Sequence, residues 1–339
     1  LCPYIKSVGD CVTVIHNCGL SDGNCYKVCP RTVTDYDLLT REFIGQSDDV
    51  VLGSYKEYCQ ARALDKRYQK PGQYGGVVTA LIAFALEQKS SNAALLTASD
   101  GLYPNWVLTR NETEVIRSAG SKYGVCPGLS GLNQAIRRGN TKIAVVGRPC
   151  QITSLRKMLH YGTLEGRNGI NLLIGLFCFW GLDYQFYRML KESKGIGRID
   201  RADIPREEGL ILDTDQGQVS LTLEETRKYV RQGCHSCFDP TSELADISVG
   251  STESDPQWST LLVRTEAGVE LVERAKALNV IETRPCPDLI ARELWEAVLN
   301  KKRRVLGGTT DDGLAINNKY IRITEESHRQ IMENGGIAT

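Results

Sequence analysis

Four cysteines at three separate points of the chain are the residues best suited to chemistry. Cys150 follows an apolar run at residues 143–146, and Cys178 follows a second one at residues 171–176. Cys234 and Cys237 form a C-x2-C pair, whose spacing lets both thiols reach one metal centre. Four thiolates is the number that an iron–sulfur cluster needs, so these cysteines predict such a cluster.

Two alternatives to this interpretation stay open. A single cysteine beside a strand often acts as a small buried apolar residue, and this holds for Cys178 taken alone. Zinc is the main competing metal for a set of four cysteines. The cysteines at the beginning of the chain favour iron–sulfur chemistry over zinc.

Residues 1–31 resemble part of a bacterial ferredoxin. Ferredoxin cysteine runs end in Cys-Pro, and the last cysteine ligates the other cluster of a two-cluster module. Cys25-x3-Cys29-Pro30 matches that ending, and Cys2-Pro3 resembles the end of an earlier run whose first cysteines lie upstream of this sequence. The gap between Cys18 and Cys25 is wider than the C-x2-C of a ferredoxin run, so the ligand assignment stays open here. By analogy Cys29 completes the truncated cluster, and Cys2, Cys18 and Cys25 share the other one, with Cys11 as the candidate for its fourth ligand.

Composition excludes several classes of protein. The 339 residues include 41 basic and 41 acidic ones, so composition gives no basic face for nucleic acid. No run of apolar residues is long enough for a transmembrane segment. Twelve cysteines in a chain of this length do not fit a small secreted disulfide scaffold. Clustered thiols point to a reducing compartment, and we expect a cytoplasmic protein.

Strand-like runs alternate with helical ones from residue 50 onward, which predicts an α/β (mixed α+β) fold. A ferredoxin-like iron–sulfur module is expected first, followed by a mixed-sheet flavin domain. A strand is expected at 50–55, and Lys301 and its basic neighbours are expected to begin a solvated tail. The expected divisions are a truncated module at 1–31, a charged connector at 32–50, a catalytic domain at 51–290 and a C-terminal arm at 291–339.

Two glycine-containing segments are suited to holding a cofactor. Gly75 and Gly76 precede an apolar helix, where a close backbone and the helix dipole favour a phosphate. A plain tight turn fits this pattern equally well. The loop from Gly120 to Tyr123 offers one cation, Lys122, and one phenol, and it suits a phosphate or a flavin ring. A solvated loop is the alternative there.

Six motifs in the same order resemble the beta subunit of coenzyme F420-reducing hydrogenase. The same family includes subunits of F420-dependent formate dehydrogenase, F420H2 dehydrogenase and F420-dependent sulfite reductase. The matching segments are residues 51–57, 73–79, 119–123, 149–151, 233–237 and 243–251. Residues 1–31 resemble the ferredoxin-type extension that some members carry.

This resemblance implies FAD, a 4Fe–4S cluster in the catalytic domain and hydride exchange with coenzyme F420. It implies that Cys150, Cys178, Cys234 and Cys237 hold that cluster. It also implies that FAD is lined by Gln73, Gly75, Gly76, Ser121, Lys122, Tyr123, Gly250 and Ser251. Lys122 is the candidate for offsetting negative charge at the flavin or its diphosphate. Arg148 is a departure, because the hydrogenase subunit has an apolar residue at this position. It is expected either to meet the acidic tail of F420 or to tune the cluster.

The implied chemistry needs no acid or base from a side chain, because hydride passes directly between F420 and FAD. FAD converts between this two-electron exchange and the single electrons that clusters carry. One or two N-terminal clusters would then pass electrons to or from a partner of hydrogenase, formate dehydrogenase, heterodisulfide reductase or sulfite reductase type. Two other functions stay open: a ferredoxin-dependent reductase of an organic substrate, like one in the chlorophyll pathway, and an electron-relay subunit without flavin.

Overall fold

The structure is a computed structural model that describes residues 4–8, 11–46, 49–99, 101–164, 169–205, 208–251, 255–309, 315–316 and 318–333. The side chains of residues 6–8, 11 and 12 are not described. Cys2 therefore lies outside the described residues, and so does the side chain of Cys11.

An eight-stranded mixed sheet forms the centre of the molecule. Its order is β14-β4-β13-β12-β8-β7-β5-β6. The middle strands β5, β7, β8 and β12 are parallel, and the outer strands pair antiparallel. The bounds are β4 Glu57–Ala63, β5 Ala93–Ala98, β6 Asn105–Thr109, β7 Ile143–Gly147, β8 Ile170–Leu176, β12 Ile247–Gly250, β13 Ser259–Val263 and β14 Ile281–Pro285. The predicted mixed α/β fold is confirmed.

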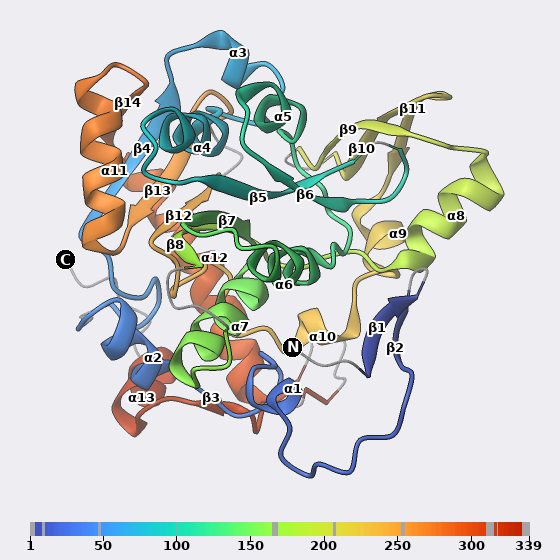
Figure 1. Cartoon of the computed structure of the whole chain (residues 1–339), viewed down its shortest axis with the longest axis vertical. Coiled ribbons are helices and arrows are strands. Elements are labelled where there is room, and N and C mark those ends of the chain that lie inside the picture. The colour runs from blue at the N-terminus through green and yellow to red at the C-terminus, as the bar shows by residue number, and fades with distance from the viewer. Residues whose placement is uncertain are drawn as a thin grey trace.

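Helices cover both faces of this sheet, because its parallel strands are apolar on both sides. One face packs on α4 Val77–Glu87, α5 Glu112–Arg117 and α11 Glu266–Ala277. The other packs on α6 Gly128–Arg137, α7 Pro149–His160 and α12 Asp288–Gly307. Figure 1 shows the sheet between these two layers of helices.

A smaller antiparallel sheet lies beside the central one. It contains β9 Ile199–Asp203, β10 Leu210–Thr214 and β11 Gly217–Leu221, and the last two form the hairpin that the sequence predicts. Helix α8 Tyr184–Lys194 packs on this sheet through Phe186 and Leu190. The chain then passes through α9 Leu223–Arg227 and α10 Gln232–His235, which carries Cys234.

The described residues at the beginning of the chain form little regular secondary structure. They contain a hairpin of β1 Ile5–Val8 and β2 Cys11–Val14 and one short helix, α1 Asn24–Lys27. The expected charged connector contains β3 Thr34–Asp35 and α2 Tyr36–Phe43. Tyr36 and Leu39 of α2 are buried in the main core, so this segment is part of the folded body.

Two expectations about secondary structure are wrong. Residues 50–55 form no strand but a turn and a loop that lead into β4, and α3 Lys66–Gln69 follows that strand. The basic stretch at 301–304 belongs to α12, and Lys301 and Lys302 are buried. Lys302 is buried because its ammonium donates to the carbonyl oxygen of Val50, at 2.8 Å, and pairs with Glu243 at 2.7 Å.

The described part of the C-terminal arm packs against the beginning of the chain. Strand β15 Ile321–Arg322 runs parallel to β3 and pairs with it. Helix α13 Glu325–Glu333 follows and buries Ile331. Among the described helices, none is both long and apolar enough to cross a membrane.

Candidate functional site

The candidate site lies where the four parallel strands of the central sheet end. Open α/β sheets bind ligands outside the carboxyl ends of their strands. A cavity of about 530 Å³ occupies that position. Its walls include Thr97 at the end of β5, Gly147 at the end of β7, Phe177 after β8 and Gly250 at the end of β12. This volume falls in the usual range for small-molecule sites.

Seven of the eight residues predicted to bind a cofactor line this cavity. They are Gln73, Gly76, Ser121, Lys122, Tyr123, Gly250 and Ser251. Gly75 is not among the lining residues. A Cβ atom at Gly75 would stand 2.8 Å from the carbonyl oxygen of Ala61, so this glycine allows close packing on β4. The sequence pattern assigned both glycines to the cofactor site, but only Gly76 lines the cavity, and Gly75 packs on β4.

Aromatic residues after β8 also line the cavity, and sequence reasoning passed over them. Phe177 and Trp180 flank Cys178 in the same segment. The ring of Trp180 stacks on that of Tyr123 with centroids 6.1 Å apart and planes 29° apart. Their position beside Cys178, at the end of a buried strand, could have predicted that they line the site.

Gly76 fixes the entry of α4 into the cavity wall. Its φ angle of +71° is left-handed, a conformation that glycine adopts without steric cost. A Cβ atom there would also stand 2.5 Å from the carbonyl oxygen of Tyr68. Both constraints hold the first turn of α4 against the cavity.

We expect Gly76→Ala to lower the free energy of unfolding by about 1–3 kcal/mol, because it combines backbone strain with a steric clash. The matched control is Gly139→Ala. Gly139 has a similar φ of +78°, but a Cβ atom there meets nothing within 4 Å. Urea unfolding of both variants separates the clash from the strain. Equal losses in the two variants would show that the contact with Tyr68 is unimportant.

Lys122 lies on the loop that forms one cavity wall. Its ammonium donates to three backbone carbonyls, those of Ser118 and Ala119, each at 2.6 Å, and that of Gly120 at 3.1 Å. Burial lowers its pKa to about 8. Its three N–H bonds are directed at the end of α5, so any effect on a bound ligand acts through its charge.

The four predicted cluster ligands come from α7, the segment after β8, and α10 with the turn that follows it. Cys150 lies in the first turn of α7, where the helix dipole favours a thiolate. Burial nevertheless raises its pKa, and so do the charges of Cys237 and Cys234. Burial also raises the pKa of Cys178 to about 12, with further increases from the charges of Cys150, Cys234 and Cys237. The charges of these thiols therefore act on one another's pKa values.

Arg148 faces the same thiols. Burial alone would lower the pKa of its guanidinium, but the charges of Cys178, Cys150 and Cys234 raise it above the ordinary value. A Cβ atom at Gly181 would lie 2.7 Å from Nη1 of Arg148, and the carbonyl oxygen of Gly181 lies 4.0 Å from the sulfur of Cys234. Arg148 therefore bridges the cavity, which it lines, and the cysteines.

Every cysteine whose side chain the structure describes is a free thiol. Among the described residues, which include the four predicted cluster ligands, no group of three or more His, Cys, Asp or Glu side chains is placed so that it could hold a metal ion. At the beginning of the chain, Cys18 and Cys25 are exposed and Cys29 is partly buried. The sulfur of Cys29 accepts a hydrogen bond from the backbone N–H of Arg31 at 3.4 Å.

A second cavity, of about 430 Å³, shares the wall at residues 119–123 with the first. Its floor includes Leu182, Phe186 and Leu210 from the smaller sheet and its helix. Its lining also carries four basic residues, Lys70, Arg117, Lys122 and Arg201, and one acidic residue, Asp200. An apolar floor with cationic neighbours suits a flat ring system that carries anionic groups.

Family comparisons cover most of the catalytic region. Residues 58–133 match the N-terminal model of the family described as "Coenzyme F420 hydrogenase/dehydrogenase, beta subunit", and residues 140–288 match its C-terminal model. The chain belongs to the coenzyme F420 hydrogenase/dehydrogenase beta-subunit family. The sequence-based recognition is confirmed. The matched segments contain all four central cysteines and the residues of the first cavity.

Individual relatives agree with this family. The chain is 32% identical over 243 residues to the coenzyme F420 hydrogenase subunit beta of Methanococcus voltae, covering 70% of this chain and 87% of that protein. It is 31% identical to the coenzyme F420-dependent sulfite reductase of Methanocaldococcus jannaschii over 82% of this chain, but only 44% of that longer protein.

The fold is also similar to a solved structure. A chain of the F420-reducing [NiFe] hydrogenase complex from Methanosarcina barkeri superposes with a TM-score of 0.70 and 28% sequence identity. The match covers 81% of this chain and 100% of that one. The mixed α/β architecture is thus shared with this family member.

Proposed function

We propose that this chain is the flavin and iron–sulfur subunit of a coenzyme F420-dependent oxidoreductase. It exchanges hydride with F420 through FAD and passes single electrons, through 4Fe–4S clusters, to or from a partner subunit. The observation that carries this proposal is that one cavity joins the predicted flavin residues to Cys178 and Arg148. Family membership supports the choice of F420.

The cavity residues fit a flavin. The left-handed turn at Gly76 brings backbone to the cavity wall without a side chain. The ring of Phe177 packs directly on Gly250, where a Cβ atom would stand 1.9 Å from Cδ2 of that ring. Phe177, Tyr123 and Trp180 offer aromatic faces for a flat ring, and Lys122 supplies a positive charge for a diphosphate. When bound, FAD would exchange hydride on one side and single electrons on the other.

The ferredoxin-like cysteines at the beginning of the chain favour an iron–sulfur cluster over zinc at the four thiols. Tetrahedral zinc also takes up to four thiolates, so the number of cysteines alone does not decide between the two. An iron–sulfur cluster is larger than one ion and takes four thiolates at its corners. Cys150, Cys178, Cys234 and Cys237 would hold it, and Arg148 would offset its negative charge.

We assign one or two further clusters to the N-terminal cysteines, with Cys29 nearest to the catalytic domain. The second cavity supports F420 binding, because its cations complement the acidic tail of that coenzyme. The chain's residues would bind and orient both ring systems. Direct hydride exchange requires no proton transfer by a side chain.

Stopped-flow spectroscopy tests this function. Anaerobic chain loaded with FAD is mixed with F420H2 or, separately, with reduced ferredoxin. We expect F420H2 to bleach the flavin, with an apparent affinity that falls as ionic strength rises. Bleaching by ferredoxin alone would instead favour the reductase of an organic substrate. If the isolated chain contains iron–sulfur clusters but no flavin, the alternative function of an electron-relay subunit would be favoured.

The pH dependence of stability tests the charge on Lys122. Its pKa in the folded chain lies below its ordinary value, so its contribution to stability is present at high pH and is lost as the pH falls through about 8. We expect the free energy of unfolding of the flavin-free wild type to rise between pH 7 and 9.5, relative to Lys122→Met, by about 1–3 kcal/mol.

Bound FAD should weaken this pH dependence, because its diphosphate would favour the charged ammonium. Lys70→Met is the control, since Lys70 is exposed. Urea unfolding at both pH values gives the comparison. An unchanged pH dependence in Lys122→Met, with or without flavin, would rule out this electrostatic role.

A further inference from the structure

Arg31 connects the beginning of the chain to the central cysteines. Its backbone N–H donates to the sulfur of Cys29. A Cβ atom at Gly233, which precedes Cys234, would lie 3.7 Å from Nε of Arg31. The guanidinium therefore lies beside the turn that carries Cys234 and Cys237.

Tyr320 of the C-terminal arm holds this guanidinium in place. Nη1 of Arg31 donates to the hydroxyl of Tyr320 at 3.0 Å, and the charge lies 5.6 Å from the centre of the tyrosine ring. The hydroxyl in turn donates to the carbonyl oxygen of Ser236, between the two cysteines of the C-x2-C pair. Tyr320 is only 5% exposed. Its contacts thus join Arg31 to the backbone of residues 234–237, which we call the cysteine turn.

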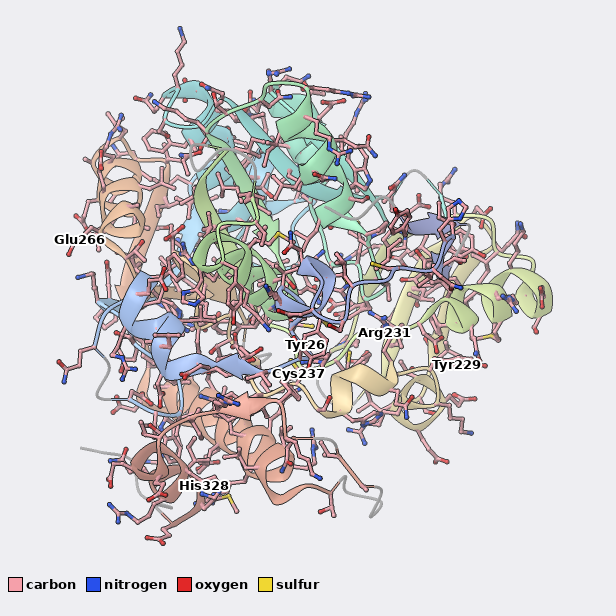
Figure 2. All side chains as sticks on the ribbon, turned by 60° about the horizontal axis from the view of Figure 1, so that its bottom comes forward. Tyr26, Tyr229, Arg231, Cys237, Glu266 and His328 are labelled. Carbon is pink, nitrogen blue, oxygen red and sulfur yellow. The ribbon has the colours of Figure 1, made fainter. Side chains whose placement is uncertain are left out.

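Backbone contacts fix this junction from both sides. The N–H of Thr34 donates to the carbonyl oxygen of Tyr320 at 2.7 Å, next to the pairing of β3 with β15. Lys157 of α7 donates to the carbonyl oxygens of Cys29, at 2.7 Å, and Val33, at 2.9 Å. Figure 2 labels Cys237 near the middle of the molecule, in the region where these two terminal segments meet. Arg31 is therefore held in place by elements from three parts of the chain.

Neither Arg31 nor Tyr320 lies in the segments that match the family models, which span residues 58–133 and 140–288. The two residues come from opposite ends of the chain and meet at one cluster ligand. Fixed charges and hydrogen bonds to ligand sulfurs tune the reduction potential of iron–sulfur clusters. A cation beside Cys237 would stabilise the reduced cluster, which carries one more negative charge.

We propose that Arg31, clamped by Tyr320, is a positioning residue that raises the reduction potential of the cluster held by Cys237. This inference rests on the proposed function, because it requires an iron–sulfur cluster at the four central cysteines. It adds that the two terminal segments, together with the catalytic domain, set the reduction potential of this cluster.

The test is an anaerobic redox titration followed by electron paramagnetic resonance. The signal of the catalytic-domain cluster is assigned by its loss in Cys150→Ala. We expect Arg31→Met to lower the midpoint potential by about 59 mV, which corresponds to a tenfold change in the equilibrium constant of a one-electron couple. Arg31→Lys should recover part of the shift, because it keeps the charge, and Tyr320→Phe should fall between wild type and Arg31→Met.

Arg322→Met is the matched control, since Arg322 is an exposed arginine on the same arm, and its midpoint should equal that of wild type. A wild-type midpoint in Arg31→Met with full iron content would overturn the inference. If Arg31→Met loses its cluster, wild-type midpoints in both Arg31→Lys and Tyr320→Phe would overturn it equally. Absence of iron–sulfur signals from the wild-type chain would instead contradict the proposed function itself.

Discussion

Replacing Cys150 with alanine should leave reduction of the flavin by F420H2 largely intact and stop electrons from reaching the partner. Cys150 lies in the first turn of α7 and is one of the four thiols proposed to hold the cluster, so its loss would remove one ligand. The first cavity, which is proposed to hold the flavin, keeps its walls, because Cys150 is not among its lining residues. We expect partner-linked turnover to fall by at least about 10–100-fold, the range seen when the environment of a metal site is disturbed.

Flavin bleaching and reduction of the natural partner are measured on the same anaerobic preparation. Cys59→Ala is the matched control. Cys59 is buried, is not one of the four proposed ligands and lines neither cavity. This variant should keep its iron and its turnover. Full turnover in Cys150→Ala with the natural partner would contradict the assigned electron path.

Lys302→Met should cause the largest loss of stability among the variants considered. The ammonium of Lys302 is fully buried, pairs with Glu243 at 2.7 Å and lies 4.6 Å from the ring centre of Phe238. Removing one partner of a buried ion pair leaves the other charge uncompensated, which costs about 3–5 kcal/mol. We expect a loss of that size in urea unfolding at pH 8.

The same change should also disturb the cysteine turn. Asp239 follows Cys237 closely, and its carboxylate accepts hydrogen bonds from the N–H groups of Thr241 and Glu243, each at 3.0 Å. The carbonyl oxygen of Asp239 lies 3.5 Å from the sulfur of Cys237. The buried charges therefore support the backbone that carries a proposed ligand, and iron content should fall together with stability.

Two controls separate the ion pair from simple loss of packing. Adding Glu243→Gln to Lys302→Met should recover part of the stability, because it removes the unpaired charge. Burial raises the pKa of Glu243 to about 7, although Lys302 opposes the increase. Its folded pKa therefore lies above the ordinary value, and the associated stability is lost as the pH rises through that pKa.

Loss of Lys302 should raise the pKa of Glu243 further, so the penalty of Lys302→Met should be smaller at pH 5.5 than at pH 8. A penalty that is equal at both pH values, with no recovery in the double variant, would assign the effect to packing.

The sequence predicted the central elements well because their apolar patterns are strong. The helix at α4 and the strand at β8 are nearly continuous apolar runs, and such runs need burial on both faces. The basic stretch containing Lys302 was misjudged for the opposite reason. In a sequence pattern, a lysine usually indicates a solvent-exposed position. Lys302 is buried instead, because it pairs with Glu243, which is distant in sequence.

The candidate site was predictable in its residue types but not in its finer organisation. Gly76 and Cys178 stand out because glycine and cysteine have distinctive chemistry at strand and helix ends. The roles of Arg31 and Tyr320 depend on a meeting of both ends of the chain, which no local spacing reveals. Arg148 was singled out as a departure from the family, and the structure places its charge at the thiols.

The most direct measurement of the central claim is the metal and flavin content of anaerobically isolated chain. The account predicts FAD together with iron and acid-labile sulfide, including about four irons that disappear in Cys150→Ala while FAD remains. Zinc in place of iron at these cysteines, or loss of FAD but not of iron in that variant, would contradict it.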